Sequence, residues 1–180
     1  MLFKISNPAR AEMFNAIFQN IKLFADNINI TFTANQIDIQ CIDSAHVAIL
    51  EVHIGSAWFD KYELSDNIEG LVIGANTNLI GKIFGTRDKI QDITVECNDE
   101  PDKLLIRFTS EDKKVYDKTF EMPLIDLDVD TMEIPDMEYE AEFSMPSQIY
   151  ANLMSQLKLF GETMDIDCSE DTIMLHSSSI

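Results

Sequence analysis

Residues 17–24 read Ile-Phe-Gln-Asn-Ile-Lys-Leu-Phe, and residues 153–160 read Leu-Met-Ser-Gln-Leu-Lys-Leu-Phe. A shift of 136 residues superimposes the two stretches without a gap and also places Asp26 on Glu162. Apolar matches arise by chance, but a shared Lys-Leu-Phe followed by an acid in register is much rarer. The chain is therefore predicted to contain a duplicated domain, and its second copy is expected to be cut short about 44 residues after it starts.

The first stretch belongs to a predicted helix that begins at Asn7-Pro8, where an Asx cap precedes a proline in the first turn. A second, short helix is predicted after Asn76-Thr77, although its two glycines weaken it. Runs of alternating or continuous apolar residues predict strands around these helices. The predicted strands cover residues 28–32, 37–41, 47–54, 71–73, 90–97, 104–108 and 115–122. The pattern indicates an α+β fold with an antiparallel meander.

The pattern restarts after a segment of alternating acids and aliphatics. We assign residues 1–122 to the first domain, 123–137 to a connecting loop and 138–180 to the start of the second domain. In the second domain, residues 139–143 alternate as in a strand, and a helix is predicted from Pro146-Ser147. The connecting segment fits either an edge strand or linker, or an acidic loop that presents Leu, Met and Ile to a partner.

The net charge of the chain excludes one class of nucleic-acid-binding protein. The 180 residues include 32 acids and 13 bases, for a net charge of −19. Such a field repels polyanions, so a basic surface that grips nucleic acid through its phosphates is excluded. The acids are uneven, because Lys158 is the only base among residues 119–180.

The cysteines and the ends of the sequence indicate the compartment. Cys41, Cys97 and Cys168 lie far apart, which is typical of buried thiols in a reducing compartment. No apolar stretch approaches 18 residues, and the N-terminal residues lack the features of a signal peptide. We expect a soluble intracellular protein.

Reaction chemistry is not evident in the sequence. His46 and His53 lie beside a single cysteine, and Asp126, Asp128 and Asp130 lack the glycine of a calcium loop, so no metal site is expected. No phosphate-binding glycine motif or nucleophile elbow occurs. We expect no cofactor and no catalytic residue, and therefore a binding or scaffolding protein.

Two segments resemble a known family. Residues 39–49, Ile-Gln-Cys-Ile-Asp-Ser-Ala-His-Val-Ala-Ile, and residues 124–135, Leu-Ile-Asp-Leu-Asp-Val-Asp-Thr-Met-Glu-Ile-Pro, resemble the eukaryotic sliding clamp family, proliferating cell nuclear antigen. The resemblance implies a DNA-clamp fold with antiparallel sheets outside and helices that line a central hole. It implies a homotrimeric ring when full length, duplex DNA as the encircled ligand, and location in the nucleus or at a viral replication site. Enclosure removes the need for tight phosphate binding, so an acidic ring is compatible with DNA.

The resemblance also implies a protein-docking pocket. It would be lined by Ile42, His46, Val47 and Ile49 under the loop, and by Met132, Ile134 and Pro135 from the loop. Spacing alone favours ordinary core positions for these aliphatics, and the resemblance reverses that order. DNA polymerase and other partners would insert a Q-x-x-aliphatic-x-x-aromatic-aromatic motif as a helical turn. A clamp loader is a further implied partner. Part of the family's pocket would lie beyond residue 180, so we expect an incomplete site.

The DNA-facing residues are carried over in the same way. Lys22 and Lys82 match family lysines, and Arg10, Arg87, Lys89 and Lys158 are plausible neighbours, although each could be an ordinary surface charge. Other positions where relatives carry bases are Asn15, Ala16, Gly85, Asn152 and Ser155, so the grip on DNA should be weaker. Glu170 occupies the position of a modified lysine in the family, which puts that modification in doubt.

The subunit interface is expected at paired edge strands, near residues 113–122 and 172–179. Its side chains would be Phe120, Leu153, Met154, Leu157 and Phe160. Two alternatives stay open: a checkpoint-type clamp subunit, and an acidic α+β peptide-binding module that does not encircle DNA.

Overall fold

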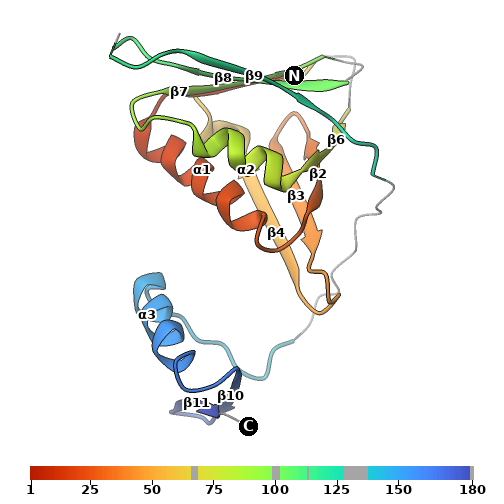
Figure 1. The fold of residues 1–180 in the computed structure, drawn as a ribbon. Helices are drawn as coiled ribbons and strands as arrows, with labels where there is room; N and C mark the ends of the chain where they lie inside the picture. Colours follow the sequence, from red (N-terminus) through yellow and green to blue (C-terminus); the bar gives the residue numbers. More distant parts are fainter. Residues whose placement is uncertain (66–68, 99–101, 113, 128–137, 179–180) are drawn as a thin grey trace. The chain divides into compact units, whose positions relative to one another are not determined.

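The computed structural model describes residues 1–65, 69–98, 102–112, 114–127 and 138–178. The chain divides into two units, Met1–Thr131 and Met132–Ile180, which are described separately (Figure 1). The residues of the connecting loop from 128 to 137, including Met132, Ile134 and Pro135, lie outside the described ranges.

The first unit combines two antiparallel sheets with two helices. One sheet has the order β5-β1-β7-β8-β9 and the other β4-β3-β2-β6. The strands are β1 (Leu2–Ile5), β2 (Asn27–Phe32), β3 (Gln36–Ile42), β4 (Ile49–Gly55), β5 (Lys61–Glu63), β6 (Leu71–Asn76), β7 (Asp92–Cys97), β8 (Lys103–Thr109) and β9 (Lys118–Pro123). The helices are α1 (Pro8–Ile21) and α2 (Thr77–Gly85), and a 3-10 turn at Ser56–Trp58 lies between β4 and β5. The predicted α+β class is confirmed.

Local sequence explains where both helices begin. Asn7 accepts hydrogen bonds from the amides of Ala9 and Arg10 at 3.0 and 3.1 Å, and proline follows the cap as predicted. Asn76 caps α2 by accepting from the amide of Leu79 at 3.0 Å. Figure 1 shows the two helices side by side, with a sheet on either side of the pair.

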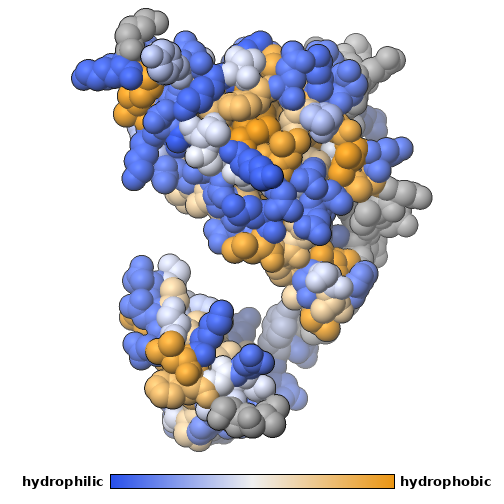
Figure 2. Space-filling model, viewed as in Figure 1, coloured by the Kyte–Doolittle hydropathy of each residue, from blue (hydrophilic) through white to orange (hydrophobic). Residues whose placement is uncertain are grey.

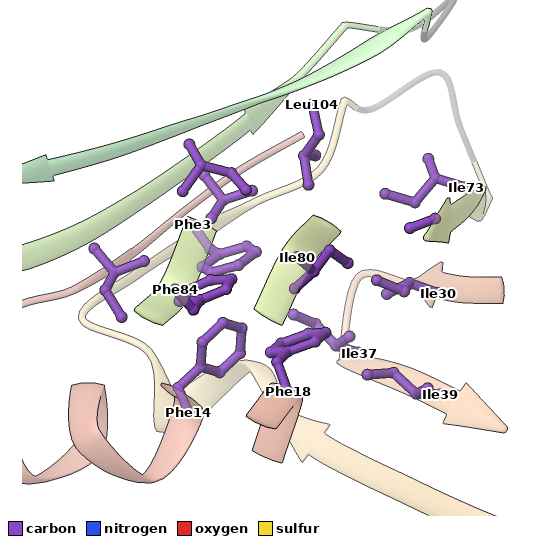
Figure 3. Packing of buried hydrophobic residues seen from close by; sticks show 14 of the residues in the cluster. Phe3, Phe14, Phe18, Ile30, Ile37, Ile39, Ile73, Ile80, Phe84 and Leu104 are labelled. Carbon is purple, nitrogen blue, oxygen red and sulfur yellow. The ribbon is translucent and has the colours of Figure 1, made fainter. Parts of the chain in front are cut away.

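An aromatic core holds the helices between the sheets. The ring of Phe84 on α2 lies 5.6 Å from Phe14 and 5.3 Å from Phe18, both on α1. Phe3 of β1 joins them, 5.5 Å from Phe14. Figure 3 shows these rings directed toward one another, with isoleucines of the four-stranded sheet on one side. This packing buries the apolar faces of both helices, so their polar faces are directed away from the core.

Two strands of this unit were not predicted. β1 and β5 contain only four and three residues, and both depend on pairing between distant segments. β1 lies between β5 and β7, with Phe3 opposite Tyr62 on one side and Val95 on the other. Such short, non-local pairs leave little periodicity for sequence reasoning to detect.

The second unit repeats the start of the first. It contains α3 (Ser147–Leu157), β10 (Thr163–Cys168) and β11 (Ile173–Ser178). Ile166 pairs with Leu175, and a shift of 136 residues turns this pair into Ile30 and Ile39 of the β2–β3 hairpin. The hairpin turn recurs as well, since the amide-to-carbonyl bond from Ser169 to Thr172 matches the one from Thr33 to Gln36, both 2.9 Å. The two hairpins therefore share one register, as a duplication requires.

The structure corrects one expectation for the second unit. Residues 139–143 form no strand, although the shift of 136 residues places 139–141 on residues 3–5 of β1, which pairs with β5 and β7 in the first unit. β11 is the counterpart of β3, which lies inside its sheet between β2 and β4. In the structure β11 pairs with β10 in a two-stranded sheet, and the interface role of residues 172–179 remains a prediction.

The second unit has little core of its own. Among its described residues none is buried: Leu153, Met154 and Leu157 are half-buried, and Phe160 is 68% exposed. The equivalent Phe24 of the first unit packs against the core. Figure 2 shows hydrophobic residues at the surface of this unit. The helical spacing of apolar residues in this unit is therefore not accompanied by burial among the described residues.

Candidate functional site

A tight loop after β3 carries the first group of predicted site residues. The carboxylate of Asp43 accepts hydrogen bonds from the amides of Val47 and Ala48, both at 2.8 Å, and from Ala45 at 3.3 Å. His46 adopts a left-handed backbone with φ of 57°, and its amide donates to the Asp43 carbonyl at 3.0 Å. The hydrogen bonds from Ala48 and Val47 lower the pKa of Asp43. One carboxylate therefore organises the whole loop.

A groove of about 250 Å³ lies between this loop and the connecting segment, over β2 and β3. Ile42, His46 and Leu127 contribute to its lining. Ile28 and Cys41 also line it, and its polar lining residues are Asn27, Asn29, Thr31, Asp38 and Gln40. Burial raises the pKa of the Cys41 thiol, which keeps it protonated. The groove thus offers apolar contacts with polar groups that can fix the orientation of a ligand.

The connecting segment forms part of this groove. Ile125 bridges to Gly74 of β6, and its amide donates to the Gly74 carbonyl at 3.0 Å. The side-chain amide of Asn29 donates to the Leu127 carbonyl at 3.4 Å. A second hollow lies along the same segment, lined in part by Val72. The segment from 124 to 127 therefore lies against the four-stranded sheet, with the second hollow along its whole length and the groove at Leu127.

The predicted docking residues separate into three groups. Ile42 and His46 line the groove. Val47 is 83% exposed and Ile49 39% exposed, and neither lines the groove, although neither is an ordinary core residue. Met132, Ile134 and Pro135 lie outside the described residues. The docking assignment as a whole remains a prediction.

Sequence reasoning missed Leu127, Asn29 and Gly74 as parts of this site. Leu127 lies within the Leu-Ile-Asp-Leu-Asp stretch that carried the family resemblance, so a signal for it was present. Asn29 and Gly74 are directly opposite each other in the β2–β6 pair, and nothing in the linear sequence joins them to residue 127.

The basic residues on the helices are few. Lys22 of the α1 C-cap donates to the side chain of Gln19 at 2.5 Å, and Lys82 is exposed on α2. Gln19 in turn donates to the Gly81 carbonyl at 2.6 Å, which ties the two helices together. In the described part of the chain, neither lysine forms an ion pair, and the same holds for exposed Lys89 and Lys158. Lys82, Lys89 and Lys158 are exposed and Lys22 is half-buried, and their DNA-facing role remains a prediction.

Two arginines have other roles. The Arg87 side chain is 1% exposed, and it donates to the Gln91 carbonyl at 2.9 Å and pairs with Glu12 at 3.4 Å. Its burial lowers the pKa of the guanidinium, and the charge of Glu12 acts in the opposite sense. We therefore remove Arg87 from the DNA-facing set, because it holds the loop after α2. Arg10 donates from Nη1 to the Trp58 carbonyl at 2.7 Å, and its guanidinium lies over the Trp58 ring, 5.9 Å from the centroid, so its head group contacts the protein.

Phe120 is the predicted interface residue of the first unit. Phe120 lies on β9, an edge strand of the five-stranded sheet, and its half-buried ring is 5.9 Å from Phe108. An edge strand with free hydrogen-bonding groups can pair with another chain. Glu170 is exposed beside the turn between β10 and β11.

The described residues contain no group of three or more His, Cys, Asp and Glu side chains that is gathered as a metal site. Within the same residues, no helix is long and apolar enough to cross a membrane.

Two antiparallel sheets around a pair of helices, with the first hairpin repeated in register 136 residues later, define a clamp-type α+β fold. The profile of the proliferating cell nuclear antigen N-terminal domain matches residues 6–131. The chain therefore belongs to the proliferating cell nuclear antigen family. It is 28% identical over 139 residues to "Proliferating cell nuclear antigen 2" of Drosophila melanogaster, covering 77% of this chain and 53% of that protein. The chain thus spans about half the length of that relative. Proteins of this family are non-enzymatic clamps, which agrees with the prediction that the chain is not an enzyme.

Proposed function

We propose that the chain functions as a DNA sliding clamp subunit, which encircles duplex DNA and docks replication and repair proteins. The observation that carries this proposal is the groove between the Asp43 loop and the connecting segment, in a chain of the proliferating cell nuclear antigen family. The two sequence motifs of the family resemblance provide five of its lining residues: Gln40, Cys41, Ile42, His46 and Leu127.

Docking in this account uses a short partner segment. A Q-x-x-aliphatic-x-x-aromatic-aromatic motif forms a helical turn and places its apolar side chains against Ile42 and Leu127. The exposed side chain of Val47 adds apolar contact at the loop. Met132, Ile134 and Pro135 of the connecting segment are proposed as further docking residues from the sequence alone. A DNA polymerase that carries such a motif is thereby tethered to DNA.

DNA retention in this account depends on enclosure. Lys22, Lys82, Lys89 and Lys158 supply a sparse basic lining on or near the helices, while the net charge of −19 disfavours tight binding elsewhere. A ring requires further subunits, and we propose a homotrimer for the full-length protein, opened and closed by a clamp loader. The proposed contact surfaces are the edge strand β9 with Phe120, and the apolar residues Leu153, Met154 and Leu157 of α3 together with Phe160 after the helix. The nucleus is the proposed location.

The experiment measures the binding of a fluorescently labelled motif peptide to the chain by anisotropy. We expect saturable binding that is weakened by Met132→Ala, by Ile134→Ala and by His46→Ala. A peptide with alanine in place of both aromatics is the control, and it should bind at least tenfold more weakly. Equal affinity for both peptides would contradict the docking proposal, and unchanged affinity in all three variants would contradict the residue assignment.

A further inference from the structure

Gly74 lies where the connecting segment meets the sheet. It is a buried residue of β6, the edge strand opposite β4 in the four-stranded sheet. No glycine in the described residues has a positive φ, so the backbone at Gly74 does not itself require glycine. The requirement is space: a Cβ atom built there would lie 2.2 Å from the Ile125 carbonyl oxygen and 3.0 Å from Cγ of Leu127. The first of these neighbours is backbone, so a larger residue must displace the segment.

The same contact includes two hydrogen bonds at neighbouring positions. The Ile125 amide donates to Gly74, and the Asn29 side chain donates to Leu127. Gly74 and Asn29 are direct partners in the β2–β6 register. The segment is therefore held at Ile125 and at Leu127 by two residues that face each other in the β2–β6 pair.

This attachment determines the position of Leu127. Leu127 is half-buried and lines the groove together with Ile42 and His46. These two residues lie much earlier in the sequence, at the end of β3 and in the Asp43 loop. If the segment moves away from β6, Leu127 leaves the groove lining, while Ile42 and His46 stay in place through β3 and the Asp43 loop. The groove then loses an apolar contact.

We propose that Gly74 is a positioning residue for the docking groove: its missing side chain lets residues 124–127 attach to β6, so that Leu127 lies in the groove before a partner binds. A groove formed in advance avoids the free energy cost of ordering the segment during association. The inference rests on the proposed docking function.

The test compares Gly74→Ala with Gly55→Ala in the full chain. Gly55 lies at the end of β4 on the other edge of the same sheet, and a Cβ there meets nothing within 4 Å. Peptide affinity is measured by anisotropy, and hydrogen exchange of the Ile125 amide is measured by NMR. We expect Gly74→Ala to lower the affinity at least fivefold and to speed Ile125 exchange at least tenfold, and Gly55→Ala to leave both within twofold of wild type.

A second pair of variants guards against failure of Gly74→Ala to fold. Ile125→Pro removes the amide that donates to Gly74, whereas Ile125→Val keeps it. We expect only the proline variant to lose affinity. Unchanged affinity in Gly74→Ala or Ile125→Pro, whether or not Ile125 exchange changes, would overturn the proposal.

Failure of the proposed function gives a different result. If the wild-type chain does not bind the peptide, the docking function fails, and the exchange measurement alone decides the attachment. Protection of Ile125 in wild type and its loss in Gly74→Ala would then support the positioning role for the segment. Equal exchange rates in the two proteins would overturn it.

Discussion

Single residues decide the local geometry of the candidate site. Asp43 shows this most directly, because three amides of one loop converge on its carboxylate. The loop presents His46 and Val47 in fixed positions although both side chains are exposed. The Asp-Ser-x-His-Val motif is therefore also a structural motif, in which the aspartate builds the loop that carries the remaining residues.

The lowered pKa of Asp43 predicts how this loop responds to pH. Because the folded-state pKa lies below the unfolded value of about 3.9, the carboxylate stabilises the loop above that value. The contribution is lost as the pH falls through the folded pKa. We expect the amide resonances of Val47 and Ala48 to titrate with a midpoint below about 3.9 in NMR spectra. A midpoint at or above this value would contradict the hydrogen-bonding role, and Asp43→Ala should abolish the titration.

Elements depend on packing more than on their own propensity. α2 has nine residues and ends with two glycines in five positions, so it is too short to be stable alone. Phe84 fixes it to α1 and to the five-stranded sheet through contacts with Phe18 and Phe108.

We expect Phe84→Ala to lower the free energy of unfolding by about 3–5 kcal/mol, because it opens a cavity among these rings. Urea unfolding followed by circular dichroism measures the change. Lys82→Ala, at an exposed position on the same helix, should change it by less than about 0.5 kcal/mol. Similar losses for the two variants would show that helix propensity, and not packing, controls α2.

The two hairpins compare the same element in two environments. β2–β3 and β10–β11 share their register, but residues of β2 alternate between buried and half-buried, whereas most of β10 is exposed. Hydrogen exchange in the full chain should therefore be at least a hundredfold faster for the amides of β10–β11 than for their β2–β3 counterparts. Equal protection in the two hairpins would mean that the second unit is stabilised by contacts that the described residues do not show.

The sequence allowed most of these elements to be predicted, because hydrophobic periodicity reports burial directly. α1 and its cap, α2 and the order of the longer strands followed from local patterns. β1 and β5 did not, because their few residues become strands only through distant partners. Residues 139–143 had the alternation of a strand without a partner, so the pattern alone gave a wrong prediction there.

The site was less predictable than the fold. Ile42 and His46 could be placed through the family resemblance, whereas Arg87 was misassigned because a buried arginine and a surface arginine look alike in sequence. The proposed role of Gly74 depends on the absence of a side chain where the connecting segment packs. No sequence motif marks such a position.

At the scale of the whole molecule, charge limits how the protein can hold DNA. With a net charge of −19 and few unpaired lysines, we expect the chain to bind a short duplex measurably only at low ionic strength. The double variant Lys22→Ala, Lys82→Ala should reduce the slope of log affinity against log salt by about two. Binding is measured by anisotropy with labelled duplex. The control is Lys61→Ala, Lys103→Ala, whose lysines are paired with Glu63 and Glu121.

Duplex binding that is as strong at about 0.15 M salt as at low ionic strength would show that DNA contacts groups other than these lysines. An unchanged salt slope in the Lys22→Ala, Lys82→Ala variant would show the same.

The central claim is that this clamp-family chain docks partner motifs in the groove between the Asp43 loop and the connecting segment. The most direct test is an NMR titration of the full chain with the Q-x-x-aliphatic-x-x-aromatic-aromatic peptide. The account predicts that the largest chemical-shift changes occur at Ile42, His46, Val47 and Leu127, with little change on β7 and β8. The absence of any shift change at saturating peptide, or changes confined to the opposite sheet or to α3, would contradict it.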